Sequence, residues 1–195
     1  HRDLHSFPTR RSSDLNEAQK YYRQFLAHKS AQTTRLVPMG VYGLAYSHFQ
    51  MKQYAQALSG FKQFLANPVN DQPKLSLDAQ CRMGDCYFVN KDYNAAINAW
   101  KAVVDGRSHE ADYALFQTAM AYGALGKSNE KLSQLDQLTS QYKQSAYYEQ
   151  ALYEGGSTHL VMNDPRAAIS RFDRLIKERP RSAYAREATL KTGLI

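Results

Sequence analysis

Apolar side chains recur every three to four residues along most of the chain, which is the spacing of an amphipathic helix. The clearest stretch runs from Ser145 to Pro180, where two such helices are expected on either side of Asn163-Asp164-Pro165. Asn and Asp favour a helix end and an N-cap, and proline fits the first turn of the next helix. No run of alternating β-branched residues exceeds a few positions. The pattern therefore predicts an all-α chain.

The same helix-turn-helix pattern recurs at steps of 39, 35, 37 and 37 residues. Each of the first four copies has a small residue in its first helix and a large apolar residue sixteen positions later, and three of them have Ala twelve positions after the first small residue. Short side chains let helix axes approach to about 8–10 Å, so these residues predict where helices cross. Together with Pro180, the repeat-defining positions are Ala45, Gly84, Ala119, Gly156 and Gly193, then Ala57, Ala96 and Ala168, then Phe61, Trp100, Leu135 and Phe172. Lys131 stands at the second small position of the third copy, which we expect to pack most loosely.

The period divides the chain into helix pairs with half repeats at both ends. We expect half repeats at 16–30 and 182–195 and full repeats at 34–69, 73–107, 108–144 and 145–181.

Residues 1–15 are left out of this organisation. Their segment HSFPTRRSSDL (5–15) resembles a translated sequencing adapter, so we expect an artefactual or disordered leader, with a native Ser/Arg-rich tail as the alternative. The native N-terminus would then be missing, and the last predicted helix is cut at Ile195. We therefore expect a fragment of a longer protein, whose full length, flanking domains and signal peptide are unknown.

The small residue, the aromatic or His three positions later, and the Ala and Phe closed by Pro180 resemble the tetratricopeptide repeat (TPR). Ser145 and Ser182 each lie six residues before an Ala. This longer period is similar to the TPR subgroup of Gram-negative envelopes, which includes the Tol-Pal coordinating protein, the barrel-assembly lipoprotein and long multi-repeat proteins. The resemblance implies a right-handed α-solenoid of stacked antiparallel helix pairs over 16–195.

Two functions from different classes are consistent with this resemblance. The first is a non-catalytic scaffold that binds other proteins in the periplasm or at the outer membrane. The cytoplasm stays open as a location, because the native N-terminus is expected to be missing. The second is a helical accessory domain of a cell-wall enzyme whose catalytic domain lies outside this sequence.

A concave surface formed by the first helices is the candidate binding site. Side chains one residue after, three before and four after each small anchor are expected to point toward it or toward the seam between repeats. These candidates are Tyr42, Tyr46, Phe49, Asp85, Phe88, Phe116, Met120, Tyr153 and Ser157, together with Tyr113 a turn earlier in its helix. TPR domains that clamp a carboxylate use Lys and Asn on this surface, and neither was found among these positions. Extended, partly apolar peptides suit such a surface. The alternative is that these side chains form the seam between repeats.

The net charge, the cysteines and the histidines do not indicate a function other than protein binding. The net charge is +7 and is concentrated in the last two predicted helices, but no nucleic-acid motif accompanies it. Cys81 and Cys86 lie about 140° apart on one helix, which disfavours a disulfide or a shared metal. His48 and His159 occupy the repeat position of Tyr87 and Tyr122 and are interpreted as packing residues.

No catalytic set or nucleotide-binding loop occurs in the sequence. We therefore expect no enzyme activity, cofactor, metal, nucleic acid or transmembrane segment. The expected partners are other proteins of unknown identity. Self-association through exposed end helices is also expected, since solenoids need polar caps.

Overall fold

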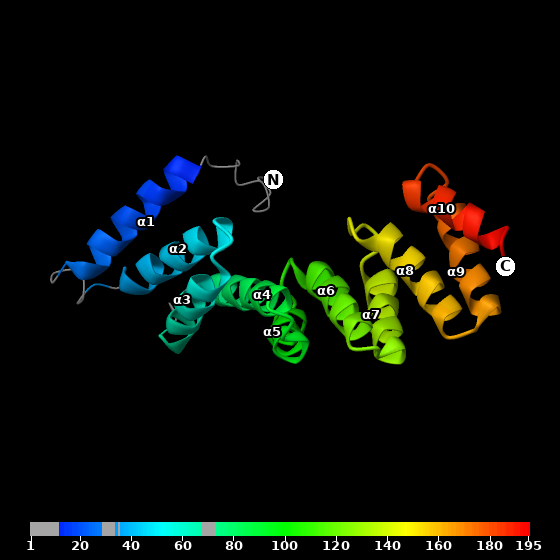
Figure 1. The fold of residues 1–195 in the computed structure, drawn as a ribbon, viewed down its shortest axis with the longest axis horizontal. Helices are drawn as coiled ribbons and strands as arrows, with labels where there is room; N and C mark the ends of the chain where they lie inside the picture. Colours follow the sequence, from blue (N-terminus) through cyan, green and yellow to red (C-terminus); the bar gives the residue numbers. More distant parts are fainter. Residues whose placement is uncertain (1–11, 29–33, 35, 68–72) are drawn as a thin grey trace. The chain divides into compact units, whose positions relative to one another are not determined.

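The computed structural model describes residues 12–28, 34, 36–67 and 73–195. Those residues form ten α-helices and no strand (Figure 1), which confirms the predicted all-α class. The helices are α1 (Ser12–Ala27), α2 (Val37–Gln50), α3 (Tyr54–Ala66), α4 (Pro73–Val89), α5 (Tyr93–Asp105), α6 (Ala111–Ala124), α7 (Ser128–Gln141), α8 (Tyr148–Val161), α9 (Pro165–Glu178) and α10 (Ala183–Thr192).

The first helix begins earlier than the sequence pattern indicated. Helix α1 starts at Ser12, so residues 12–15 of the expected leader are helical, while residues 1–11 lie outside the described part of the chain. Asp14 in the first turn suits the positive end of the helix dipole. The boundary between leader and half repeat at Asn16 therefore does not coincide with the helix start.

The helices are divided into two compact units between Asp92 and Tyr93. In the first unit α1 packs on α2, α2 on α3 and α3 on α4, and α2 also contacts α4. In the second unit each helix from α5 to α9 packs against the next one, and α8 also contacts α10. The contacts α2–α4 and α8–α10 join the first helices of successive pairs, and such contacts stack one helix pair on the next.

Every three-residue turn within a pair has the same backbone. The residue seven positions after each small anchor has a positive φ, which is 59° at Lys52, 62° at Lys91, 71° at Gly126 and 58° at Asn163. Its amide donates to the carbonyl three residues earlier, and the next amide donates to the carbonyl five residues earlier; in the first turn both distances are 2.9 Å. This pair of hydrogen bonds is the Schellman helix ending. The predicted helix stop at Asn163 is confirmed.

Side chains close the opposite ends of the helices at equivalent places. The hydroxyls of Ser108, Ser145 and Ser182 each accept from the amide two residues later, at 3.3, 3.0 and 3.1 Å. Asp164 Oδ1 accepts from the amide of Ala167 at 3.1 Å, as an N-cap does. These contacts confirm the N-cap at Asp164 and show that the three serines, which are 37 residues apart, are equivalent. Helices α6 and α8 begin three residues after their serines.

The repeat-defining residues lie in the core of each unit. Side chains at all of these positions except Pro180 and Gly193 are buried. Gly193 is exposed because α10 ends at Thr192, which makes it the C-cap of that helix rather than an anchor between two helices.

The close approaches of paired helices involve residues 15 or 16 positions after the anchor. A Cβ added to Gly60 would lie 2.7 Å from the Cβ of Ala45, so α2 and α3 approach closely there. In the last pair, the ring of Phe172 fills the space beside Gly156. The residue twelve positions after the anchor is buried but is not the residue that faces Gly156.

Lys131 does not loosen the third helix pair in the way the sequence suggested. A Cβ on Gly123 would lie 3.2 Å from the Cδ of Lys131, so the lysine stem covers the opposite helix. The amine reaches Glu154 Oε2 at 2.7 Å, and only 15% of the lysine side chain is exposed. The long side chain is therefore accommodated by a glycine on one side and a carboxylate on the other.

Candidate functional site

The predicted aromatic residues of α2 lie against the following helices. The hydroxyl of Tyr42 donates to Asp78 Oδ2 in α4 at 2.5 Å. Its ring packs edge-on to Phe64 with 5.3 Å between centroids. Burial and the nearby carboxylate raise the pKa of Tyr42 above its usual value. Tyr42 therefore connects three helices of the first unit.

Phe49 takes part in the same layer between α2 and α4. The guanidinium of Arg82 lies 5.7 Å from the Phe49 ring centroid and pairs with Asp85 at 2.7 Å. Tyr46 stacks on Tyr42 with 6.0 Å between centroids. Phe49 thus takes part in a contact between α2 and α4, whereas the contacts of Tyr46 with Tyr42 and of Asp85 with Arg82 lie within one helix. All three candidates are half-buried, as is Phe88.

In the second unit the candidates surround aromatic residues of the following helices. Tyr147 lies 5.6 Å from Tyr113 and 5.3 Å from Phe116 between ring centroids. Met120 packs on the buried cluster that contains Leu135. Phe116 is only 5% exposed. These contacts favour the seam interpretation for this part of the predicted surface.

Tyr153 and Ser157 of α8 contact the amine of Lys191, which the sequence pattern did not predict. The Nζ of Lys191 in α10 lies 5.2 Å from the Tyr153 ring centroid and 3.4 Å from Ser157 Oγ. The Tyr153 ring also packs against Phe172 and Tyr184. Lys191 lies one helix pair further along the chain, so spacing within a single repeat could not reveal it.

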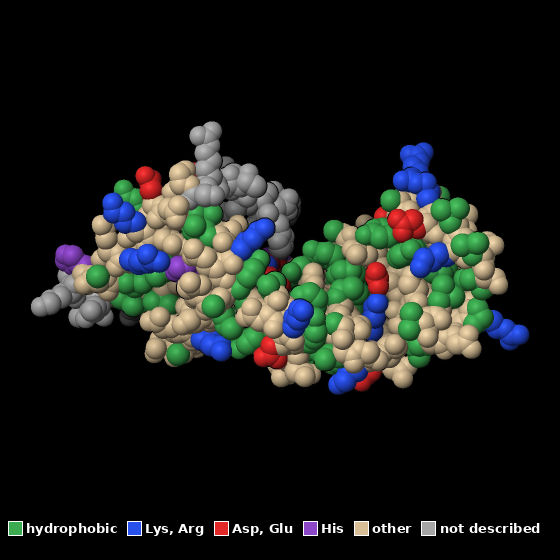
Figure 2. Space-filling model, in the orientation of Figure 1, with side chains coloured by type: hydrophobic (Ala, Val, Ile, Leu, Met, Phe, Trp, Pro, Cys, Tyr) green, Lys and Arg blue, Asp and Glu red, His purple; other side chains and the backbone are tan. Residues whose placement is uncertain are grey.

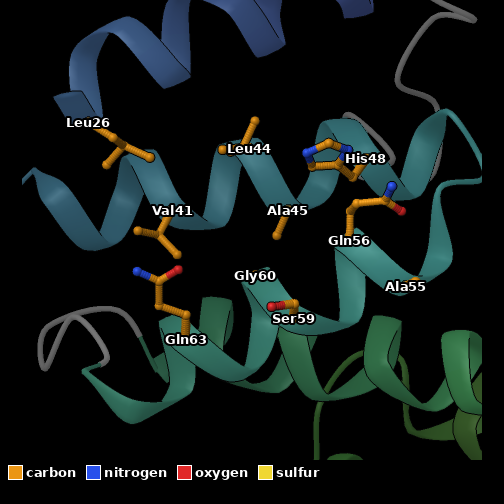
Figure 3. A pocket seen from close by; sticks show the side chains of 10 residues that line it. All are labelled: Leu26, Val41, Leu44, Ala45, His48, Ala55, Gln56, Ser59, Gly60 and Gln63. Atoms are coloured by element: carbon orange, nitrogen blue, oxygen red, sulfur yellow. The ribbon is translucent and has the colours of Figure 1, made fainter.

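An open groove lies on a different stripe of α2, between α1 and α3. Its volume is about 420 Å³. Leu26, Val41 and Leu44 are its large apolar lining residues, and α3 contributes the small residues Ala55, Ser59 and Gly60. Figure 3 shows the lining side chains, which are Leu26, Val41, Leu44, Ala45, His48, Ala55, Gln56, Ser59, Gly60 and Gln63. None of them is an Asp, Glu, Lys or Arg.

A buried polar cluster closes one end of this groove. His48 Nδ1 lies 3.1 Å from Gln19 Nε2 and 2.5 Å from Gln53 Oε1. Gln19 Nε2 also donates to Gln53 Oε1 at 3.1 Å and to the sulfur of Met51 at 3.3 Å. The exposed fraction of His48 is 8%, which confirms it as a packing residue with a polar tip.

Several basic residues of α9 and α10 are used inside the second unit. Arg174 Nη2 donates to the Tyr148 hydroxyl at 2.8 Å, and that hydroxyl donates to Glu178 Oε2 at 2.5 Å. Arg171 Nη2 pairs with Asp136 at 2.5 Å. On the face shown in Figure 2, Lys and Arg side chains are scattered over each unit. Part of the positive charge of α9 is therefore paired with carboxylates inside the second unit.

The two cysteines and His159 lie in packed surroundings. Cys81 and Cys86 are buried and form no disulfide with each other, and burial raises the pKa of Cys86 to about 12. His159 is half-buried, and burial together with Arg171 lowers its pKa. Among the described residues, no group of three or more His, Cys, Asp or Glu side chains could hold a metal ion. No described helix combines the length and apolar character needed to cross a bilayer.

Comparisons with solved structures identify the fold. YrrB, described as a TPR protein with an unusual peptide-binding site, is 21% identical over 91% of this chain and 84% of its own, with a TM-score of 0.70. MamA from Desulfovibrio magneticus RS-1 is 18% identical over 87% of this chain and 88% of its own, with a TM-score of 0.68. BtubC from P. vanneervenii is 14% identical over 95% and 81%, with a TM-score of 0.67.

Family comparisons cover most of the repeats. A search of curated proteins finds no match. One tetratricopeptide-repeat family model matches residues 42–111 and 153–190, and a second matches residues 113–145. The chain therefore belongs to the tetratricopeptide-repeat family.

Proposed function

We propose that this chain is a non-catalytic scaffold of a Gram-negative envelope protein, and that it binds a segment of another protein in the groove between α1 and α3. Tetratricopeptide repeats indicate protein-protein interaction as the general function. The periplasmic location rests on the resemblance of the repeats to envelope TPR proteins.

The open groove is the observation that carries the assignment of a binding surface. It has the size and the mostly apolar lining of a ligand site, with a few polar groups at its edge. The predicted first-helix residues are less suitable, because many of their rings contact neighbouring helices.

Site-specific photo-crosslinking tests this proposal. A photoreactive amino acid at Ser59, on the groove, is compared with one at Ser170, the equivalent residue of the last repeat, in periplasmic and cytoplasmic extracts of a Gram-negative bacterium. We expect a protein to crosslink from Ser59 and not from Ser170, and the purified protein to bind the chain. The absence of any crosslink that depends on position would contradict the scaffold, and capture only from cytoplasmic extract would contradict the location.

A further inference from the structure

We infer that the groove of the first unit accepts one large, uncharged apolar side chain of a peptide segment, with the neighbouring peptide groups bonded to Gln56 and Gln63. The inference rests on the proposed function and adds the chemistry of the ligand. It concerns a surface of α2 other than the predicted stripe of Tyr42, Tyr46 and Phe49.

The lining of the groove selects against charge. Leu26, Val41 and Leu44 are its large apolar lining residues, and none of the lining residues that the structure describes is an Asp, Glu, Lys or Arg. An ion placed there would lose hydration without gaining an opposite charge, so a neutral group is favoured. The Nδ1 atom of His48, at one end, is already engaged by Gln19 and Gln53.

The edge of the groove suits a peptide backbone. Gln56 and Gln63 lie on α3 beside the opening, as Figure 3 shows. Each carboxamide offers two donors and an acceptor, which matches the N–H and C=O groups of an extended peptide. A ligand that brings an apolar side chain and adjacent peptide groups would therefore meet both kinds of lining.

The last repeat fills the equivalent space with its own side chain. Arg171 stands 111 positions after Gly60, just as Gly156 stands 111 positions after Ala45. The Cδ of Arg171 lies 2.9 Å from where a Cβ on Gly155 would be, so its stem covers α8 there. Its guanidinium continues to Asp136 in α7 and bridges α9 to α7.

Gly60 therefore has no side chain at a position where the last repeat has a long one, and Leu44 stands where the last repeat has Gly155. The next filling position changes similarly, since Arg174 of the last repeat corresponds to Gln63. Arg174 reaches the carbonyl of Thr139 in α7 at 3.4 Å. The first unit has Gly60 and Gln63 in place of these two arginines, and the side chain of the ligand would lie in the groove beside Leu44.

Four end-blocked peptides, acetyl-Gly-Gly-X-Gly-Gly-amide with X as Leu, Phe, Lys or Glu, test the chemistry on the full chain. Binding is followed by nuclear magnetic resonance at the side-chain amides of Gln56 and Gln63. We expect the Leu and Phe peptides to shift these signals with Kd values near the millimolar range, and the Lys and Glu peptides to bind at least about ten-fold more weakly.

Two variants locate the site. The double variant Ala45→Gly with Gly60→Arg introduces the residue pair of the last repeat, and it should abolish binding of the Leu peptide. Ala45→Gly is included because a Cβ at position 60 would meet Ala45. Ser59→Asp adds charge at the groove and should weaken binding about ten-fold, whereas Ser170→Asp in the last repeat should not change it. If the double variant fails to fold, the serine pair still decides the question.

Three results would overturn the inference. The first is equal shifts with the Leu and Lys peptides, and the second is binding that Ser59→Asp leaves unchanged. The third is shifts that appear when the chain alone is concentrated and that disappear with Ser59→Asp, because these would identify a second copy of the chain as the occupant. A protein that crosslinks to the chain while the peptides fail this test would retain the scaffold and reject the apolar selectivity.

Discussion

The ammonium of Lys131 in α7 lies 2.7 Å from a carboxylate oxygen of Glu154 in α8 and joins the third helix pair to the fourth. Three sister repeats have Ala at the position of Lys131, so the repeat pattern alone would suggest that Ala is acceptable there. In this chain the lysine stem also covers Gly123.

We expect Lys131→Ala to lower the free energy of unfolding by about 1–2 kcal/mol, because the carboxylate of Glu154 loses its partner in a mostly buried site. Denaturant titration measures the change. Lys101→Ala is the matched control, since Lys101 pairs with Asp105 on the exposed surface of α5 and should have no measurable effect. Equal effects of the two substitutions would show that the Lys131 contact is not specific.

The lysines in the left-handed turn positions carry conformational strain. Lys52→Gly and Lys91→Gly should each raise the free energy of unfolding by about 0.5–1 kcal/mol, because glycine adopts a positive φ without a Cβ penalty. Gly126→Ala should lower it by about 1 kcal/mol although its Cβ would meet nothing within 4 Å. Lys127→Gly serves as the control, since Lys127 has a φ of −92° and should gain nothing. Thermal melts of the four variants would contradict this account if Lys127→Gly were stabilising to the same extent.

Trp100 is fully buried at the large apolar position of its repeat. Trp100→Ala should cost about 3–5 kcal/mol, through lost burial and the cavity that remains. Equilibrium unfolding in urea, followed by circular dichroism, measures the change. A loss below about 1 kcal/mol would mean that the assigned register is wrong there.

We expect His159 to make the second unit less stable in mild acid. Burial and Arg171 lower its pKa in the folded state, while Asp164 and Asp136 oppose this shift. The unfolded chain therefore binds the proton first, near pH 6.5, and stability falls as the pH decreases from about 7 toward 5. His159→Tyr introduces the residue that sister repeats carry at this position and should flatten the dependence. Thermal melts between pH 7 and 5 would contradict the assignment if both proteins lost stability in parallel.

The aromatic contacts of the first helices also predict the outcome of truncation. Tyr42→Ser should cost about 2–4 kcal/mol, since it removes a ring packed on Phe64 and the hydrogen bond to Asp78. Tyr153→Ser should cost about 1–3 kcal/mol through its contacts with Phe172 and Tyr184. Unchanged thermal stability with lost partner capture would instead support a ligand surface on this face.

The repeat register could be predicted from sequence because it depends on spacing within about 40 residues. The positions of Ala45 and Phe61, and the caps at Asp164 and Ser182, follow from such local patterns. The residue type of Asn163 predicts a left-handed turn, because Asn tolerates a positive φ, whereas the residue type of Lys52 and Lys91 does not. Their turn conformation becomes apparent only when the four repeats are aligned.

Contacts across repeats could not be inferred in the same way. Arg171 reaches Asp136, 35 residues earlier, and Lys191 reaches Tyr153, 38 residues earlier. Nothing in the local pattern of either helix specifies such pairs. One feature of the sequence could have indicated the groove, namely Gly60 in the interior of a helix. Glycine is disfavoured there unless a close approach of two helices requires it.

The shared turn has a consequence for how such a chain changes length. Because Gly126 and Asn163 occupy the same point of two identical turns, deletion of residues 127–163 would join Gly126 directly to Asp164. The junction would keep the glycine that ends one helix and the aspartate that starts the next. Recombination at these points would thus remove or insert a whole helix pair without creating a new loop.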